Sequence, residues 1–184
     1  NHRISGVDLE TTYTRSFELF GGGPESMTWR FYGTYLGENS IQNKGGLRDE
    51  RAGQVGGGIA GAGGLPKYRV ISNINYRNGP VSVFLQGRWI DGGKLDRNRV
   101  ESTTRITNSI DDNTVPSTFY TDLNLGYTAG VEDNLNIYFK VLNLFDRAPV
   151  STPQSIGRAG TTEFNTSLYD VIGRRYVLGV NYQF

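Results

Sequence analysis

The last nine residues read Tyr176-Val177-Leu178-Gly179-Val180-Asn181-Tyr182-Gln183-Phe184. Every second residue, from Tyr176 to Phe184, is aromatic or aliphatic, whereas the positions between them carry mainly glycine, asparagine and glutamine. Alternation with a period of two predicts a β-strand that has one apolar and one polar face. The apolar face carries an aromatic residue at each end.

Six further stretches alternate in the same way, and turns or polar segments separate them. The predicted strands cover 4–17, 27–36, 67–77, 81–89, 119–128, 135–141 and the closing stretch 176–184. Short connections at 21–26, 78–80 and 130–134 contrast with long ones at 37–66, 91–117 and 146–174. The second short connection contains Asn78-Gly79, a strong signal for a hairpin. Arg15 falls on an apolar face, so we expect either a bulge or a membrane boundary there.

The spacing of aromatic residues sets a length scale for the apolar face. Three strands carry a pair of aromatic residues that are eight residues apart: Tyr68 with Tyr76, Phe119 with Tyr127, and Tyr176 with Phe184. Eight residues span about 26 Å of strand, or about 20 Å of depth at a tilt near 40°. Aromatic girdles in outer-membrane barrels flank an apolar band of about 25 Å, with short periplasmic turns and longer extracellular loops. The pattern therefore predicts seven meandering antiparallel strands of a transmembrane β-barrel.

The opposite face is polar and charged on the same strands. It holds Asp8, Glu10, Arg30, Arg69, Arg88, Asp122, Asn124 and Lys140. Such side chains are costly in a protein core and suit a hydrated barrel interior. A soluble carbohydrate-binding β-sandwich is an alternative, because its strands also alternate, but its strands usually have about five or six residues.

Composition excludes several classes of protein. No apolar run approaches the roughly 18 residues of a transmembrane helix, and the mean hydropathy is −0.44. The net charge of +1 gives no reason to expect nucleic acid as a partner, and the absence of cysteine excludes disulfide and thiolate chemistry. The sequence from Asn1 onward does not begin with a secretory signal, so we expect an exported form to have its N-terminus elsewhere or to have had a signal removed.

Motifs for catalysis or cofactors are weak. Gly56-x-Gly58-x-x-Gly61 matches the dinucleotide fingerprint in letters, but it opens no helix and lacks the acidic residue about 20 positions later. His2 is the single histidine, so neither a Ser-His pair nor a histidine-rich metal site can be built. We expect no enzyme activity and no cofactor, although outer-membrane lipases and proteases are barrels too.

The loop at 91–117 is the best candidate for ligand contact. Five acidic residues could bind a divalent cation but do not follow a calcium-loop spacing; they are Asp91, Asp96, Glu101, Asp111 and Asp112. Interleaved lysine and arginine residues favour a solvated loop of mixed charge. Four residues near the outer mouth of the predicted barrel could contact an anionic ligand: Arg88, Trp89, Arg97 and Arg99.

Three segments resemble TonB-dependent outer-membrane receptors. The first resembles the Asn-Leu-Phe-Asp segment near the end of those receptors; it reads Val141-Leu142-Asn143-Leu144-Phe145-Asp146-Arg147. The entry at 64–69, with Asn73-Ile74-Asn75-Tyr76 after it, looks like their loop-to-strand entry, and residues 169–184 are similar to their closing strand. The resemblance covers roughly residues 64 to 184; residues 1 to 63 agree by pattern only.

The resemblance implies the C-terminal part of a barrel of about 22 strands. Residues 1–184 would form one segment of the transmembrane domain, without the plug domain. The family imports siderophores, cobalamin or oligosaccharides across the outer membrane of Gram-negative bacteria, powered by the TonB energy-coupling complex. Expected partners are outer-membrane lipid, the rest of the barrel and plug, that complex, and a small nutrient. The family's assembly signal maps onto Tyr176, Leu178, Val180, Tyr182 and Phe184. A structural or passive outer-membrane barrel remains the main alternative.

Overall fold

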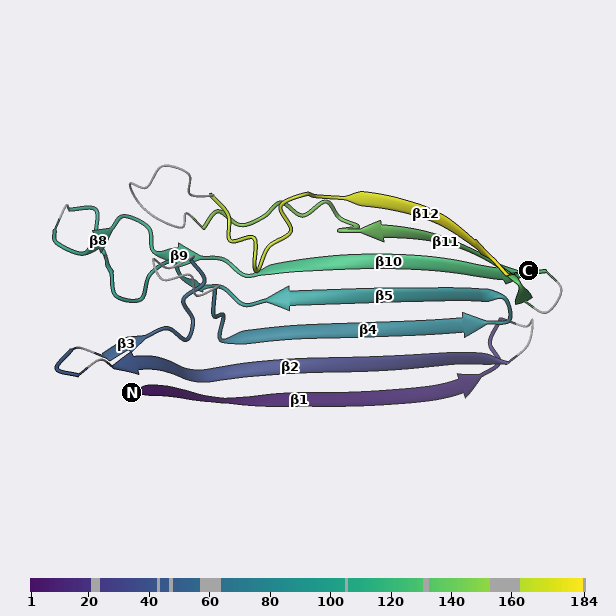
Figure 1. The fold of residues 1–184 in the computed structure, drawn as a ribbon, viewed down its shortest axis with the longest axis horizontal. Helices are drawn as coiled ribbons and strands as arrows, with labels where there is room; N and C mark the ends of the chain where they lie inside the picture. The colour runs from purple at the N-terminus through teal and green to yellow at the C-terminus, as the bar shows by residue number, and fades with distance from the viewer. Residues whose placement is uncertain are drawn as a thin grey trace.

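The chain forms a long antiparallel sheet (Figure 1). The computed structural model describes residues 1–20, 24–42, 44–46, 48–56, 64–104, 106–130, 133–152 and 163–183. Within these ranges the fold is all-β, as predicted, and no helix is long and apolar enough to cross a membrane. The strands follow the order β1 (His2–Phe17), β2 (Glu25–Gln42), β4 (Tyr68–Asn78), β5 (Val81–Ile90), β10 (Thr118–Ala129), β11 (Leu135–Leu142) and β12 (Arg175–Tyr182), and β3 (Arg48–Glu50) pairs with β2.

The connections alternate between short and long, as the sequence predicts. The short ones gather at one end of the sheet and the long ones at the other (Figure 1). At the hairpin between β4 and β5, Gly79 has a φ of 51°, which glycine adopts without a steric cost. Two parts of the predicted turns, 21–23 and 131–132, lie outside the described residues, as does most of the Gly56-x-Gly58-x-x-Gly61 stretch.

The pairing register keeps the apolar positions on one face of the sheet and the polar positions on the other, from strand to strand. Residues directly opposite each other point to the same face, and the apolar positions oppose one another strand after strand. Trp29 opposes Ile74, which opposes Leu85, and Leu85 opposes Leu123. The row continues through Leu125 and Phe139 to Leu178. On the other face Asn73 pairs with Gln86, and the Gln86 amide donates to Asn73 Oδ1 at 2.9 Å.

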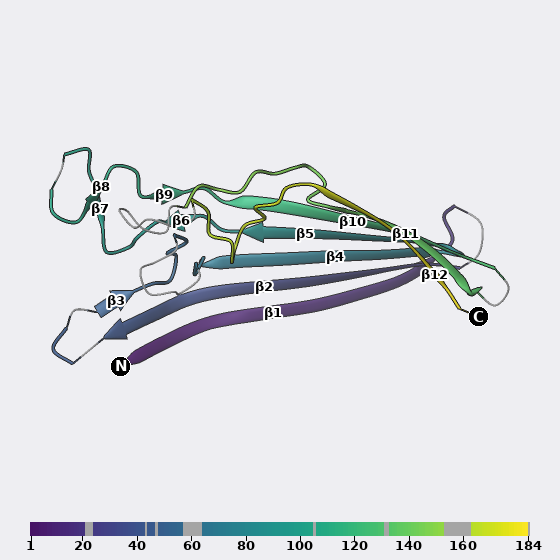
Figure 2. The same ribbon diagram turned by 45° about the horizontal axis from the view of Figure 1, so that its top comes forward.

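The described residues place no second layer over the apolar face. Tyr68 is 46% exposed and Leu178 is 72% exposed, and Leu123 is half-buried. A β-sandwich built from this chain alone would cover these side chains. The sheet is also open: β1 and β12 lie at opposite ends of the strand order, and no described strand pairs with the outer side of either (Figures 1 and 2). A closed barrel is therefore not formed by these strands alone.

Three expectations about the connections need correction. The stretch after Gly37 is not wholly loop, because β2 runs on to Gln42 and pairs with both β1 and β3. The loop at 91–117 contains two short ladders, one between β6 (Gly93–Lys94) and β9 (Thr114–Val115) and one between β7 (Val100–Glu101) and β8 (Ser109–Ile110). Arg15 pairs regularly with Met27, so the bulge alternative is wrong there and the membrane boundary stays a prediction; the register shifts between Ser5 and Gly6 instead, where Gly37 has no opposite residue.

The buried core lies at the loop end, against the polar face. It consists of Val55, Ile90, Val115, Tyr120, Leu168 and Tyr169. Ile90 and Tyr120 occupy positions on the polar face, since Tyr120 opposes Arg88 and Ile90 opposes Thr118. The other members come from three separate loops. The described parts of these loops therefore pack together over the polar side of the sheet, and they leave the apolar side uncovered.

The segment around Asn143 ends β11 with a tight turn. The Asn143 side chain, which is fully buried, accepts from the Arg147 N–H at 2.8 Å and donates to the Arg147 carbonyl oxygen at 3.0 Å. Its own N–H donates to Asp122 Oδ1 at 2.8 Å. Asn143 and Asp146 have φ values of 52° and 51°, a left-handed conformation that asparagine and aspartate tolerate best after glycine. Asp146 Oδ1 then accepts from Arg174 N–H at 2.9 Å, which sets the start of β12.

Candidate functional site

A basic pocket lies among the loops at the long-loop end. Its volume is about 480 Å³, within the range of small-molecule sites. Four cationic side chains and a single carboxylate line it, together with a buried asparagine and three glycines: Lys67, Lys94, Arg97, Arg99, Asp91, Asn113, Gly53, Gly92 and Gly93. The whole chain has a net charge of only +1, so this excess of positive charge is local.

Gly53 brings two of the cations together. Its φ of +85° favours glycine, and a Cβ placed there would lie 3.3 Å from Lys67 Cγ and 3.6 Å from Arg97 Nη1. The aliphatic stem of Lys67 and the guanidinium of Arg97 therefore both lie against the same glycine. The two residues are far apart in sequence, and they meet because Gly53 N–H donates to the Leu65 carbonyl oxygen while Lys94 N–H donates to the Gly53 carbonyl oxygen.

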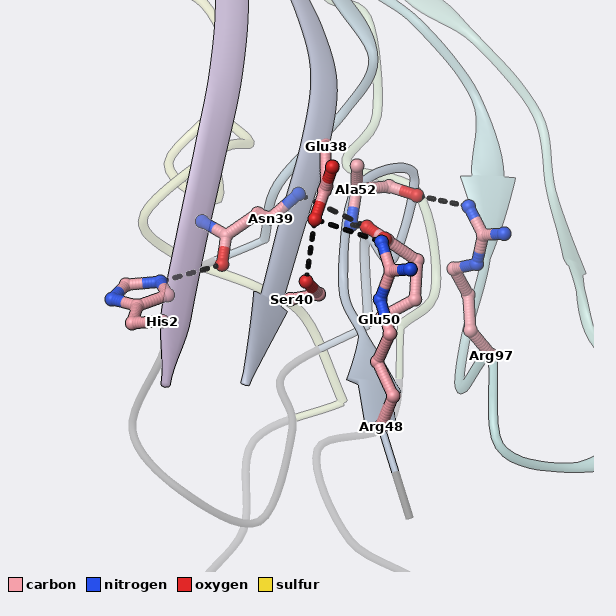
Figure 3. Close-up of polar contacts among 8 residues, drawn as sticks. All are labelled: His2, Glu38, Asn39, Ser40, Arg48, Glu50, Ala52 and Arg97. Atoms are coloured by element: carbon pink, nitrogen blue, oxygen red, sulfur yellow. Dashed lines mark hydrogen bonds and ion pairs between the residues drawn. The ribbon is translucent and has the colours of Figure 1, made fainter. Parts of the chain in front are cut away.

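Glu50 positions Arg97 through the backbone of Ala52. One oxygen of the Glu50 carboxylate, Oε1, accepts from the N–H groups of Asn39 and Ala52, each at 3.0 Å. Ala52 is fully buried, and its carbonyl oxygen accepts a hydrogen bond from Arg97 Nη1 (Figure 3). On the outer side, Arg48 pairs with Glu38 at 2.8 Å and with Glu50 at 3.4 Å. The end of β2, β3 and the second long loop are thus held by one network.

The electrostatics of this network favour charged carboxylates. Burial opposes the ionised form of Glu50, but hydrogen bonds from the Asn39 and Ala52 amides, with the charges of Arg97 and Arg48, outweigh it and hold the pKa of Glu50 below 4.5. The hydrogen bond from Asn98 is the main cause that lowers the pKa of Asp49 below 3.8, against partial burial and with help from Arg51. Asn98 Nδ2 donates to Asp49 Oδ1 at 2.8 Å, which ties the second loop to β3.

Asn113 fixes the backbone that carries Arg97 and Arg99. Its side chain is buried; it accepts from Asp96 N–H at 2.9 Å and donates to the carbonyl oxygens of Asp96 at 2.9 Å and Arg99 at 3.2 Å. The Arg99 guanidinium lies 3.4 Å from Asp96, and Lys94 Nζ lies 3.4 Å from Glu101. Both ion pairs are partly exposed, and exposed pairs of this kind contribute little to stability.

The four candidate residues for ligand contact are divided by the structure. Arg97 and Arg99 line the pocket. Arg88 lies on the polar face of β5, 3.9 Å from Asp122 and over the ring of Tyr120. Trp89 lies on the opposite face, where it lines a separate hollow with Phe119 and Arg147.

Two pocket residues escaped the sequence analysis. Lys67 comes just before β4, inside the 64–69 segment that resembles the receptor entry, and Lys94 belongs to β6; neither was assigned to ligand contact. The signal that could have pointed to them is positional, because both lie close in sequence to the loop ends of β4 and β5. Three of the five acidic residues of the second loop have partners: Asp96 pairs with Arg99, Glu101 with Lys94, and Asp112 accepts from the Thr114 N–H. Within the described ranges no group of three His, Cys, Asp or Glu side chains could hold a metal ion.

No family model, curated protein or solved structure matches this chain. The remaining sequence-predicted residues lie in the closing strand. Tyr176, Leu178, Val180 and Tyr182 share the apolar face of β12 and are 61%, 72%, 60% and 54% exposed. Phe184 lies outside the described residues. This row lies on β12, the last strand of the sheet order, which pairs with β11.

Proposed function

We propose that this chain is the C-terminal part of the transmembrane β-barrel of a TonB-dependent transporter in the outer membrane of a Gram-negative bacterium. One observation carries the proposal. A continuous apolar face runs across all the long strands, and the described residues leave it uncovered, while the described parts of the loops pack on the polar side. Lipid is the solvent that accepts an uncovered apolar face of this extent, and a hydrated barrel interior accepts the polar face.

The open edges support a larger barrel. An unpaired strand edge in a membrane leaves backbone donors and acceptors without partners, which costs several kcal/mol for each group in hydrocarbon. The edges of β1 and β12 would therefore each pair with a strand outside these residues. In the proposed arrangement the exposed row of β12, with Phe184, forms the signal that the outer-membrane assembly machinery recognises.

The three segments that resemble the receptor family favour an active transporter over a passive barrel. The turn around Asn143 supports this preference, because Asn143 and Asp146, the two polar residues of the Asn-Leu-Phe-Asp segment, each have side-chain hydrogen bonds that hold the turn. The imported nutrient would be a siderophore complex, cobalamin or an oligosaccharide, and the TonB complex would act on parts of the transporter other than these residues.

The gene segment that encodes the residues before Asn1 gives the simplest test. A plug domain and further barrel strands encoded there are the expected result. Barrel strands without a plug domain would favour a passive or structural barrel. Fractionation adds a second test: the protein should remain with outer membranes after a carbonate wash and should need detergent for extraction. A protein that stays monodisperse in water without detergent would overturn the proposal and favour a soluble sandwich.

A further inference from the structure

The basic pocket holds more positive charge than its surroundings neutralise. The aliphatic stem of Lys67 and the guanidinium of Arg97 lie against the same glycine, so two cationic side chains share one side of the pocket. Repulsion between like charges in one site is relieved when an anion binds there. Glu50, the carboxylate that acts most closely on Arg97, already accepts two backbone hydrogen bonds and faces Arg48 on its other oxygen. Asp91 is the one carboxylate among the pocket-lining residues.

The other two cations are held by bonds that a ligand can replace. Lys94 and Arg99 pair with Glu101 and Asp96 at 3.4 Å, and the side chains of the Lys94 pair are about half exposed, at 48% and 49%. Exposed pairs of this kind are weak. A multivalent anion that reaches Lys67 and Arg97 at once offers charge-assisted hydrogen bonds, which are roughly twice as strong as neutral ones.

The backbone of the pocket is set in advance. Asn113 fixes the segment that carries both arginines, and Gly93 allows the loop to approach so closely that a side chain there would collide with the carbonyl oxygen of Gly53. Prearranged cations lose less conformational freedom on binding, which favours affinity.

We propose that this pocket binds a compact anion that carries two or more carboxylate or phosphate groups. The inference rests on the proposed transporter function in one respect, because it makes the imported nutrient, or a group on it, an anion of this class. Lys67 and Arg97 hold one anionic group beside Gly53, and Lys94 and Arg99 hold a second. The volume of about 480 Å³ accommodates a small organic anion.

The test measures binding directly. The full protein, purified in detergent, is titrated calorimetrically with citrate, with inorganic pyrophosphate and with neutral glucose. Citrate or pyrophosphate should bind and glucose should not; the preferred anion shows whether carboxylate or phosphate is recognised. Raising the ionic strength from about 0.01 M to about 1 M shortens the Debye length from about 30 Å to about 3 Å and should weaken binding.

Variants locate the site. Lys67→Gln and Arg99→Gln should each weaken anion binding about tenfold, as expected for the loss of one charged hydrogen bond. Lys44→Gln provides the matched control, because Lys44 is an exposed lysine at the same end of the sheet and does not line the pocket. It should change affinity less than about twofold.

The two proposals fail separately. If neither anion binds to the unaltered protein, or if Lys67→Gln and Arg99→Gln together leave affinity unchanged, the pocket assignment is wrong, whereas a barrel that still needs detergent keeps the proposed function. If the protein is soluble without detergent but binds the anion through Lys67 and Arg99, the transporter is refuted and the pocket stands.

Discussion

The rings of Tyr35 and Tyr68 stack across β2 and β4, with centroids 4.9 Å apart and planes inclined by 29°. The two residues are directly paired, and both are exposed on the apolar face near its loop end. Trp89 and Phe119 form another directly paired aromatic set at this end, two strands further along the sheet. Aromatic rings gathered at one level of a barrel mark the boundary between hydrocarbon and water.

This stacked pair should contribute a measurable coupling free energy. In a double-mutant cycle, Tyr35→Ala and Tyr68→Ala together should cost less than the sum of the single losses, with a coupling of about 1 kcal/mol. Urea-induced unfolding in lipid vesicles measures the free energy of unfolding of the unaltered protein, of each single variant and of the double variant. Additive losses, within about 0.3 kcal/mol, would show that the rings do not interact.

At the opposite end, Glu25 holds the first short turn. Its buried carboxylate accepts from Leu19 N–H at 2.9 Å, from Phe20 N–H at 2.6 Å and from Tyr76 OH at 2.8 Å. Glu25→Ala should bring the amide hydrogen exchange of Leu19 and Phe20 close to the unprotected rate, because both donors lose their acceptor. Tyr76→Phe removes one donor only and serves as the control, with protection largely retained. Full protection in the Glu25→Ala variant would contradict this role.

Asn143 should be difficult to replace. Asn143→Ala removes both side-chain hydrogen bonds to Arg147 and places a side chain that disfavours positive φ at 52°, so we expect a loss of about 2–4 kcal/mol in unfolding free energy. Asn143→Gly keeps the backbone freedom and loses only the hydrogen bonds. It should be the milder variant, and an equal or larger loss in the glycine variant would show that the backbone conformation does not matter.

The loop network around Glu50 should weaken in acid. The pKa values of Glu50 and Asp49 are lowered in the folded chain, below 4.5 and 3.8. Because the folded-state values lie below the unfolded ones, their stabilisation is complete above the ordinary pKa values and is lost as the pH falls through the folded-state values. Amide exchange at Asn39 and Ala52, corrected for the intrinsic rate, should therefore accelerate below pH about 4. Glu50→Gln should remove most of this pH dependence.

Strand positions were predictable because alternation is a local signal. Five long strands, β4, β5, β10, β11 and β12, were predicted to within about two residues, and the hairpin at Asn78-Gly79 was found from its dipeptide. The end of β2 was missed because Glu38, Asn39 and Ser40 carry no apolar rhythm. That segment is a strand because β1 and β3 pair with it on either side. The short ladders of the second loop depend on contacts distant in sequence and left no local pattern.

The pocket was predictable only in part. Arg97 and Arg99 lie close in sequence, and both were predicted to contact a ligand. Lys67 joins them because of the positive φ of Gly53, which the sequence alone does not indicate. Arg88 and Trp89 were grouped because they are adjacent. Adjacent residues of a strand point to opposite faces, and the structure separates them accordingly.

The central claim is that the apolar face meets hydrocarbon and the polar face meets water. Spin labels placed one at a time on cysteines at residues 122–127 of β10 test it directly, since the chain has no cysteine of its own. In lipid vesicles, labels at Leu123, Leu125 and Tyr127 should collide with dissolved oxygen, while labels at Asp122, Asn124 and Gly126 should collide with a water-soluble nickel chelate. A label at Lys44, exposed in the loop before β3, provides the aqueous reference. Labels at Leu123 and Leu125 that are shielded from both reagents, or that collide with the nickel chelate, would contradict the account.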